Sequence, residues 1–219
     1  VIVAWALPRG MGRRAPARGS EEGYWRRFGQ GFAFLRGEPL LLSVVVVVGV
    51  TNLLDAAFGQ VLVFVWARES GHGPAVVGLN SSVMGFTAVG GSLVAAAVAH
   101  RMRRRPVLFA AFLIAGPPRF LILAVDAPVW AVAAVFALGG FAGGLLNPIL
   151  GAVSYGRVPR SLLGRVNALS DSLSWAGIPL GGLAGGVAVA ADAALTLPPD
   201  KVGLVASIAA CCSAYAALL

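Results

Sequence analysis

The chain has 219 residues, of which 58% are hydrophobic and only 12% are charged, and its formal net charge is +8. Soluble domains carry about 25% charged residues, and a soluble fold of this size cannot cover so much apolar surface. Together with a mean hydropathy of +0.83, the composition excludes an ordinary soluble domain and predicts an integral membrane protein.

The N-terminal part of the chain begins in an apolar run, "VIVAWALPRG", and continues as a charged segment. A signal peptide would place its positive charge before the apolar run, so residues 1–8 are interpreted as the end of a membrane helix. Residues 9–37 are interpreted as a linker, whose stretch "EEGYWRRFGQGFAFLRGEP" is compatible with an amphipathic helix at the membrane interface. The C-terminal residues, "SIAACCSAYAALL", also stop inside an apolar run, and we expect the chain to be a piece of a longer protein.

Residues 38–219 contain six apolar stretches that reach or approach the length of about 20 residues that a membrane-spanning helix needs. The uninterrupted length favours helices over strands, even in the valine run at 44–48. The sequence therefore predicts an all-α integral membrane fold, a bundle of six transmembrane helices. Their expected ranges are about 40–66, 74–99, 106–125, 128–153, 162–191 and 202–219.

The basic residues are distributed unequally between the two sides of this predicted bundle. Only Arg68, Arg119 and Lys201 belong to one side. An excess of arginine marks the cytoplasmic side of a membrane protein. We therefore expect the linker and the arginine-rich loops to be cytoplasmic in a cell membrane, the inner membrane of a bacterium. The fourteen residues of that side are Arg9, Arg13, Arg14, Arg18, Arg26, Arg27, Arg36, Arg101, Arg103, Arg104, Arg105, Arg157, Arg160 and Arg165.

The composition of the loops argues against other functions. The arginine cluster at 101–105 lies in a short loop between two spans, so it offers no exposed groove or helix to nucleic acid. His72 and His100 lie on opposite sides of the membrane, and Cys211 and Cys212 are adjacent within an apolar run. These residues form no metal-ligand or catalytic pattern, so we expect no cofactor, no metal and no enzymatic activity.

Three stretches resemble the major facilitator superfamily. "VAHRMRRRPVL" is similar to the family's loop between spans eight and nine, with His100 where an Asp is usual. "GRVPRSLLGRVNAL" resembles the ten–eleven loop of the branch that includes macrolide and enterobactin exporters, and "SWAGIPLGGLAGG" resembles span eleven of that branch. The residues that match the two loops are Arg101, Arg104 and Arg105 in the first, and Val158, Pro159, Leu162, Gly164, Arg165 and Val166 in the second.

This resemblance implies the C-terminal half of a 12-helix fold, whose six-helix N-terminal half is missing from the sequence. It also implies a secondary active transporter that exports a small molecule by alternating access, with the proton as coupling ion. The two loops would then act as cytoplasmic gates, through His100, Arg101, Arg104, Arg105 and Arg165.

Asp55 lies near the middle of the first predicted span, where a charge costs roughly 2.5–3.5 kcal/mol on insertion scales. It must therefore face the bundle interior or a wet cavity. Asn52 precedes it by three residues and shares its helix face. The functional interpretation is a substrate or proton site, and the alternative is a structural ion pair or the wall of a cavity. Arg119 lies at a similar depth and could pair with Asp55, but we favour the interpretation that it extends to the outer interface.

Two further polar features lie in the predicted helices. One is a polar stripe at helical spacing, formed by Asn167, Ser170, Asp171 and Ser174. This stripe would line the cytoplasmic mouth of the pathway, or it would form interhelical hydrogen bonds. Asn147 precedes a helix-kinking Pro148, which would mark the pathway or only a bend. Glycines spaced by four predict close helix packing, at Gly139 and Gly143, Gly140 and Gly144, and Gly177, Gly181 and Gly185.

The resemblance thus implies a proton-coupled exporter of small amphiphilic molecules, such as drugs, antibiotics or siderophores. Its expected partners are membrane lipids, the substrate, the missing half and the proton. The alternatives are a truncated or non-transporting membrane protein on a transporter-like scaffold, and an importing permease.

Overall fold

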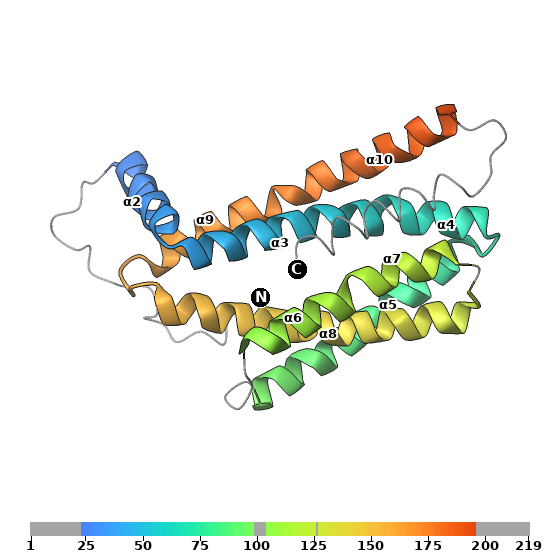
Figure 1. The fold of residues 1–219 in the computed structure, drawn as a ribbon, viewed down its shortest axis with the longest axis horizontal. Coiled ribbons are helices and arrows are strands. Elements are labelled where there is room, and N and C mark those ends of the chain that lie inside the picture. Colours follow the sequence, from blue (N-terminus) through green and yellow to red (C-terminus); the bar gives the residue numbers. More distant parts are fainter. Residues whose placement is uncertain (1–22, 99–103, 126, 196–219) are drawn as a thin grey trace, which may run out of the picture.

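The computed structural model describes residues 23–98, 104–125 and 127–195, and the regular structure in these ranges is helical (Figure 1). Five of its segments are long and apolar enough to cross a membrane, and they lie where five of the six spans were expected. The sixth expected span, at 202–219, falls outside the described residues, as do residues 1–8. The five segments are Pro39–Glu69, Gly73–Val98, Pro106–Ala124, Val129–Arg157 and Leu163–Ala191.

Most of these segments are built from shorter helices. The first span consists of α3 (Pro39–Ala57), a single π-helical segment η1 (Phe58–Leu62) and α4 (Val63–Glu69). The third consists of α6 (Arg104–Ala115) and α7 (Pro117–Ala124), and the fifth of α9 (Leu163–Trp175) and α10 (Gly177–Leu195). Two spans are continuous, α5 (Gly73–Val98) and α8 (Val129–Arg157). A further helix, α2 (Tyr24–Gly37), precedes the spans.

The interruption of the third span has a local cause. Gly116 adopts φ −92° and ψ −89°, and Pro117 and Pro118 follow it. Proline has no backbone N–H to donate to the preceding turn, so the helix breaks here and starts again. The new helix sets the direction in which the side chain of Arg119, the residue after Pro118, points.

The spans pack in two groups (Figure 1). In one group, α9 and α10 lie along α3 and η1; in the other, α6 and α7 lie along α8, which also packs against α5. In the first group α3 and η1 pack against helices that are distant in sequence, whereas in the second group α6 and α7 precede α8 directly in the chain. The groups are joined by the α4–α5 turn, in which Gly71 and Gly73 take a positive φ of 71° that favours glycine.

Glycine brings the backbones of paired helices together. A Cβ atom placed on Gly140 or Gly144 would lie 2.2 or 2.1 Å from a carbonyl oxygen of α5. The same holds for Gly177 and Gly181, whose added Cβ atoms would lie 2.3 and 2.0 Å from carbonyl oxygens of α3. The expectation that these glycines serve close packing is confirmed, whereas Gly143 has nothing within 4 Å of its added Cβ and does not serve it.

The apolar core lies toward the α4–α5 end of the bundle. Phe58, Phe120 and Phe136 meet there, with ring centroids 4.7 Å apart for Phe58 and Phe120 and 5.7 Å apart for Phe58 and Phe136. Trp66 and Leu62 belong to the same cluster and are buried. The aromatic contacts join both helix groups at this end, so the space between the groups lies toward the other end, near α2 and α9.

Candidate functional site

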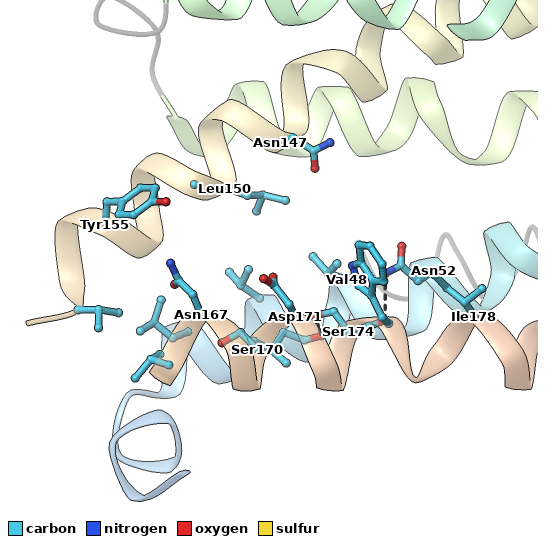
Figure 2. Close-up of a pocket in the computed structure, with 17 residues that line it drawn as sticks. Val48, Asn52, Asn147, Leu150, Tyr155, Asn167, Ser170, Asp171, Ser174 and Ile178 are labelled. Carbon is cyan, nitrogen blue, oxygen red and sulfur yellow. Dashed lines mark hydrogen bonds between the residues drawn. The ribbon is translucent and has the colours of Figure 1, made fainter. Parts of the chain in front are cut away.

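A cavity of about 520 Å³ lies between α3, α9 and the C-terminal part of α8 (Figure 2). It reaches from Tyr155 and Val158, near the α2 end of the bundle, to Asn52 and Ile178 in its interior. One wall is apolar and valine-rich, whereas the facing walls carry amide, hydroxyl and carboxylate groups. The polar residues that line it are Asn52, Asn147, Tyr155, Asn167, Ser170, Asp171 and Ser174.

The stripe on α9 supplies most of these polar groups. Asn167, Ser170, Asp171 and Ser174 recur at spacings of three and four residues, which places them on one face of the helix. In Figure 2, Asp171 points into the space between α9 and α8. The described structure thus brings this stripe to the cavity near the α2 end of the bundle.

Hydrogen bonds between α3 and α9 fix the floor of the cavity. The Asn52 side-chain amide donates to the backbone carbonyl of Ser174 over 2.9 Å, and the Ser174 hydroxyl donates to the carbonyl of Val45 over 3.5 Å. Ser174 is buried, so its hydroxyl serves this helix contact. Asn52 and Ser174 therefore line the cavity and also form the interhelical hydrogen bonds that were the alternative interpretation of the stripe.

A second cavity of about 180 Å³ adjoins the first and shares Asn52 and Asn147 with it. Asn147 lies just before Pro148 inside α8 and is exposed to both spaces. The inner cavity contains Asp55 and Arg119. Polar groups therefore continue from the α9 stripe, past the two asparagines, to a pair of opposite charges.

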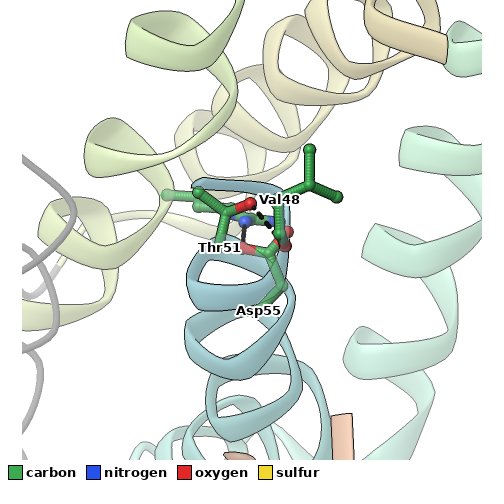
Figure 3. Close-up of polar contacts among 4 residues, drawn as sticks. Val48, Thr51 and Asp55 are labelled. Carbon is green, nitrogen blue, oxygen red and sulfur yellow. Dashed lines mark hydrogen bonds and ion pairs between the residues drawn. The ribbon is translucent and has the colours of Figure 1, made fainter. Parts of the chain in front are cut away.

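Arg119 donates a hydrogen bond to the Asp55 carboxylate, and the two side chains form an ion pair (Figure 3). The Arg119 side chain is 7% exposed, whereas the Asp55 side chain is 40% exposed toward the cavity. The interpretation that Arg119 extends to the outer interface is therefore wrong. The break at Gly116 starts a new helix at Pro117, which directs Arg119 inward.

The surroundings of Arg119 are aromatic on two sides. Its guanidinium carbon lies 5.1 Å from the centroid of the Phe58 ring and 5.6 Å from that of Phe120. Such contacts stabilise a cation that has little access to water. Its Nε atom is buried and has no hydrogen-bond partner within the described residues. Arg119 is thus held by one carboxylate and two rings, and Asp55 is the part of the pair that opens on the cavity.

The gating loops expected from the resemblance are only partly described. His100 and Arg101 lie outside the described residues, and Arg104 and Arg105 fall at the start of α6 without described side chains. Arg165 lies on α9, where its guanidinium donates to the Gln30 side chain of α2 over 2.7 Å. Within the described residues, no group of three His, Cys, Asp or Glu side chains could hold a metal ion.

Sequence reasoning missed Tyr155 and Gln30. Tyr155 lies eight residues after Asn147, about two helical turns, so the shared face was a usable signal. Gln30 contacts a residue 135 positions away, and nothing in the local sequence indicates that contact.

Comparison with known protein families identified a match. The family model described as Major Facilitator Superfamily matches residues 40–219, which include all described spans apart from Pro39, the first residue of the first span. No curated protein matches the chain, and no solved structure matches it.

Proposed function

The chain belongs to the Major Facilitator Superfamily, a family of multi-pass secondary transporters, and we propose that it is the C-terminal half of a proton-coupled exporter. In this proposal a six-helix N-terminal half completes the pathway, and alternating access moves small amphiphilic molecules such as drugs, antibiotics or siderophores. The arginine-rich end of the bundle, with α2 and the start of α9, faces the cytoplasm of a bacterial cell.

The large cavity supports an amphiphilic substrate. Its valine-rich wall on α3, with Val44, Val45 and Val48, offers apolar contact, and the stripe on α9 offers hydrogen bonds. Binding sites for small molecules commonly combine a largely apolar lining with a few polar groups that fix orientation. The apolar cluster around Phe58 closes the opposite end, which suits the cytoplasm-facing state of an alternating-access cycle.

The main support for proton coupling is the ion pair between Asp55 and Arg119 at the inner end of the cavity. A proton on the Asp55 carboxylate would remove its charge and weaken its hold on Arg119. The pair is therefore a two-state element that a proton coming through the cavity can bias, as coupled transport requires. Asp171 lines the same cavity nearer its mouth, is exposed, and has no described ion pair with a basic residue.

The test uses the full-length protein in proteoliposomes that carry ethidium as an amphiphilic probe. Transport is measured in two modes, efflux driven by an imposed pH gradient and exchange of ethidium at equal pH on both sides. We expect Asp55→Asn to abolish the response to the gradient and to retain exchange per folded molecule, because asparagine cannot take up the proton. The matched control, Asp171→Asn, should retain both.

A structural role for the pair predicts a different pattern. If Asp55→Asn only destabilises the bundle, efflux and exchange fall together, and both recover in Asp55→Asn/Arg119→Gln, which leaves no unpaired charge. Gradient-driven efflux that persists in Asp55→Asn would remove Asp55 from the mechanism. Gradient-driven uptake would favour an importing permease, and the absence of ethidium transport in both modes would contradict an exporter of such amphiphilic cations.

A further inference from the structure

Helix α2 lies across the end of the bundle, close to the first residues of the first span (Figure 1). It runs from Tyr24 to Gly37, and a single residue, Glu38, separates it from α3, which begins at Pro39. Glu38 adopts φ −111° and ψ 87°, so the chain changes direction there. Because α3 enters the membrane directly after this turn, α2 is held at the level of the membrane surface.

The inner face of α2 is docked on the spans. Leu35 is 1% exposed and belongs to a cluster with Leu41 and Val45 of α3 and Val166 of α9. Five residues earlier, Gln30 accepts the hydrogen bond from Arg165. Gly31 lies so close to α9 that an added Cβ would stand 3.6 Å from the Cβ of Arg165. This side of α2 is therefore fixed to α3 and α9 by both apolar and polar contacts.

The docked cluster also forms part of the cavity described above. Leu41, Val45, Val158 and Val166 contact the Leu35 cluster and line the mouth of the large cavity. A shift of α2 would therefore move the residues that shape this mouth.

A second face of α2, next to the docked one, carries a row of exposed aromatic side chains. Trp25, Phe28 and Phe32 are 79%, 43% and 46% exposed, and their spacing of three and four residues puts them on one face. Trp25 and Phe28 pack edge to face with ring centroids 6.3 Å apart, so the row forms a contiguous surface. Leucine and valine dominate the outward faces of the spans, whereas Trp and other aromatic residues are enriched where a protein meets the lipid headgroups.

The charge of α2 is of one sign. Its sequence, "YWRRFGQGFAFLRG", contains three arginines and no acidic residue. Arg26 and Arg36 are exposed, and Arg160, in the loop after α8, is exposed near the same end of the bundle, where Arg157 pairs with Glu38 over 3.7 Å. A helix with exposed aromatic residues, arginines and a position at the membrane surface matches the chemistry of an anionic phospholipid interface.

We propose that α2 binds the anionic phospholipid surface of the membrane and holds the mouth of the large cavity in its described form. Trp25, Phe28 and Phe32 enter the boundary between headgroups and acyl chains, and Arg26 and Arg36 contact lipid phosphates. Leu35 and the Gln30–Arg165 hydrogen bond transmit the position of α2 to α3 and α9. This role is independent of which substrate is carried and in which direction.

The first experiment locates the aromatic face relative to the bilayer. Nitroxide labels are placed at Phe28→Cys and, as a matched control, at Ala33→Cys, which is exposed on another face of α2. The background is the full-length protein with its native cysteines replaced, in nanodiscs of phosphatidylcholine and phosphatidylglycerol at about 7:3. We expect the label at position 28 to collide more with oxygen than with nickel(II) ethylenediaminediacetate, as a lipid-inserted label does. The label at position 33 should show the reverse.

Two results would overturn the insertion. A label at position 28 as accessible to the nickel complex as that at position 33 would place the aromatic face in water. A label at position 28 shielded from both reagents would show that protein covers this face.

The second experiment tests the lipid charge and the link to the cavity mouth. Hydrogen exchange over residues 163–169 of α9 is compared between nanodiscs of phosphatidylcholine alone and nanodiscs that contain phosphatidylglycerol. We expect exchange to be several-fold slower with the anionic lipid, and Arg26→Gln/Arg36→Gln to remove the difference. Phe109→Ala, which removes an exposed aromatic side chain from α6, should leave the difference between the two lipids unchanged. Equal exchange in both lipids would refute the dependence on anionic lipid.

Discussion

The contact between α5 and α8 allows a sharp test of the packing, because adjacent glycines of α8 differ in their surroundings. A Cβ added to Gly144 would lie 2.1 Å from the carbonyl oxygen of Ala88, whereas ordinary contact begins at 3.4 Å. In Gly144→Ala the two helices must separate by roughly 1 Å at this point, and overpacking of this kind costs about 1–3 kcal/mol. The separation also strains the hydrogen bond from the Ser92 hydroxyl to the Gly144 carbonyl, now 3.0 Å long and worth about 0.6 kcal/mol.

Gly143→Ala is the matched control for this substitution. Nothing lies within 4 Å of its added Cβ, and alanine stabilises a helix interior over glycine by about 0.5–1 kcal/mol. The same gain offsets part of the cost in Gly144→Ala, which leaves a net loss of about 0.5–3 kcal/mol. The free energy of unfolding is measured by titration with SDS in mixed micelles and followed by circular dichroism. Equal effects of the two substitutions would refute the direct backbone contact.

Three further predictions concern buried side chains, each measured by the same unfolding titration. Asp55→Asn should cost about 3–5 kcal/mol, because it leaves the 7%-exposed Arg119 cation unpaired. Arg119→Gln should cost less, because the Asp55 carboxylate opens on the cavity. Equal losses of stability would contradict this asymmetry. Asn80→Leu should stabilise by about 1–3 kcal/mol, since neither amide atom of the fully buried Asn80 has a hydrogen-bond partner in the described part of the chain; a loss of stability would reveal a partner. Phe120→Ala should cost about 3–5 kcal/mol because the ring is 0% exposed, whereas Phe86→Ala, at an 84%-exposed site, should be nearly neutral; similar costs would place Phe120 outside the core.

The sequence predicted the helical class and the positions of five spans because that information is local. An apolar run of sufficient length must satisfy its own backbone hydrogen bonds inside a bilayer, so its composition alone indicates a helix. The glycine spacing likewise predicted close packing at Gly140, Gly144 and Gly181. It did not distinguish Gly143 from Gly144, because the helix face that meets α5 depends on the tertiary arrangement.

The candidate site was harder to predict because its decisive contacts join distant segments. At its depth along its own helix, the Arg119 side chain could reach either the outer membrane interface or Asp55. The break at Gly116 and the inward direction of the next helix decide between them. Arg165 was assigned to a gating loop by resemblance alone, and its contact with Gln30 depends on the position of α2.

The pairing of helices distant in sequence has a consequence for how the protein is made. Asp55 and Arg119 are separated by 64 residues, and Asn52 and the carbonyl group it binds by 122. At a synthesis rate of about 5–20 residues per second, Arg119 is synthesised roughly 3–13 s after Asp55, and the α9 partner of Asn52 is synthesised roughly 6–24 s after Asn52. During that interval a carboxylate and an amide on α3 lack the partners that they have in the finished bundle. We therefore expect depletion of an insertase to affect this chain before it affects proteins whose helices pair in order, because these polar groups of α3 are unpaired until α9 has been synthesised.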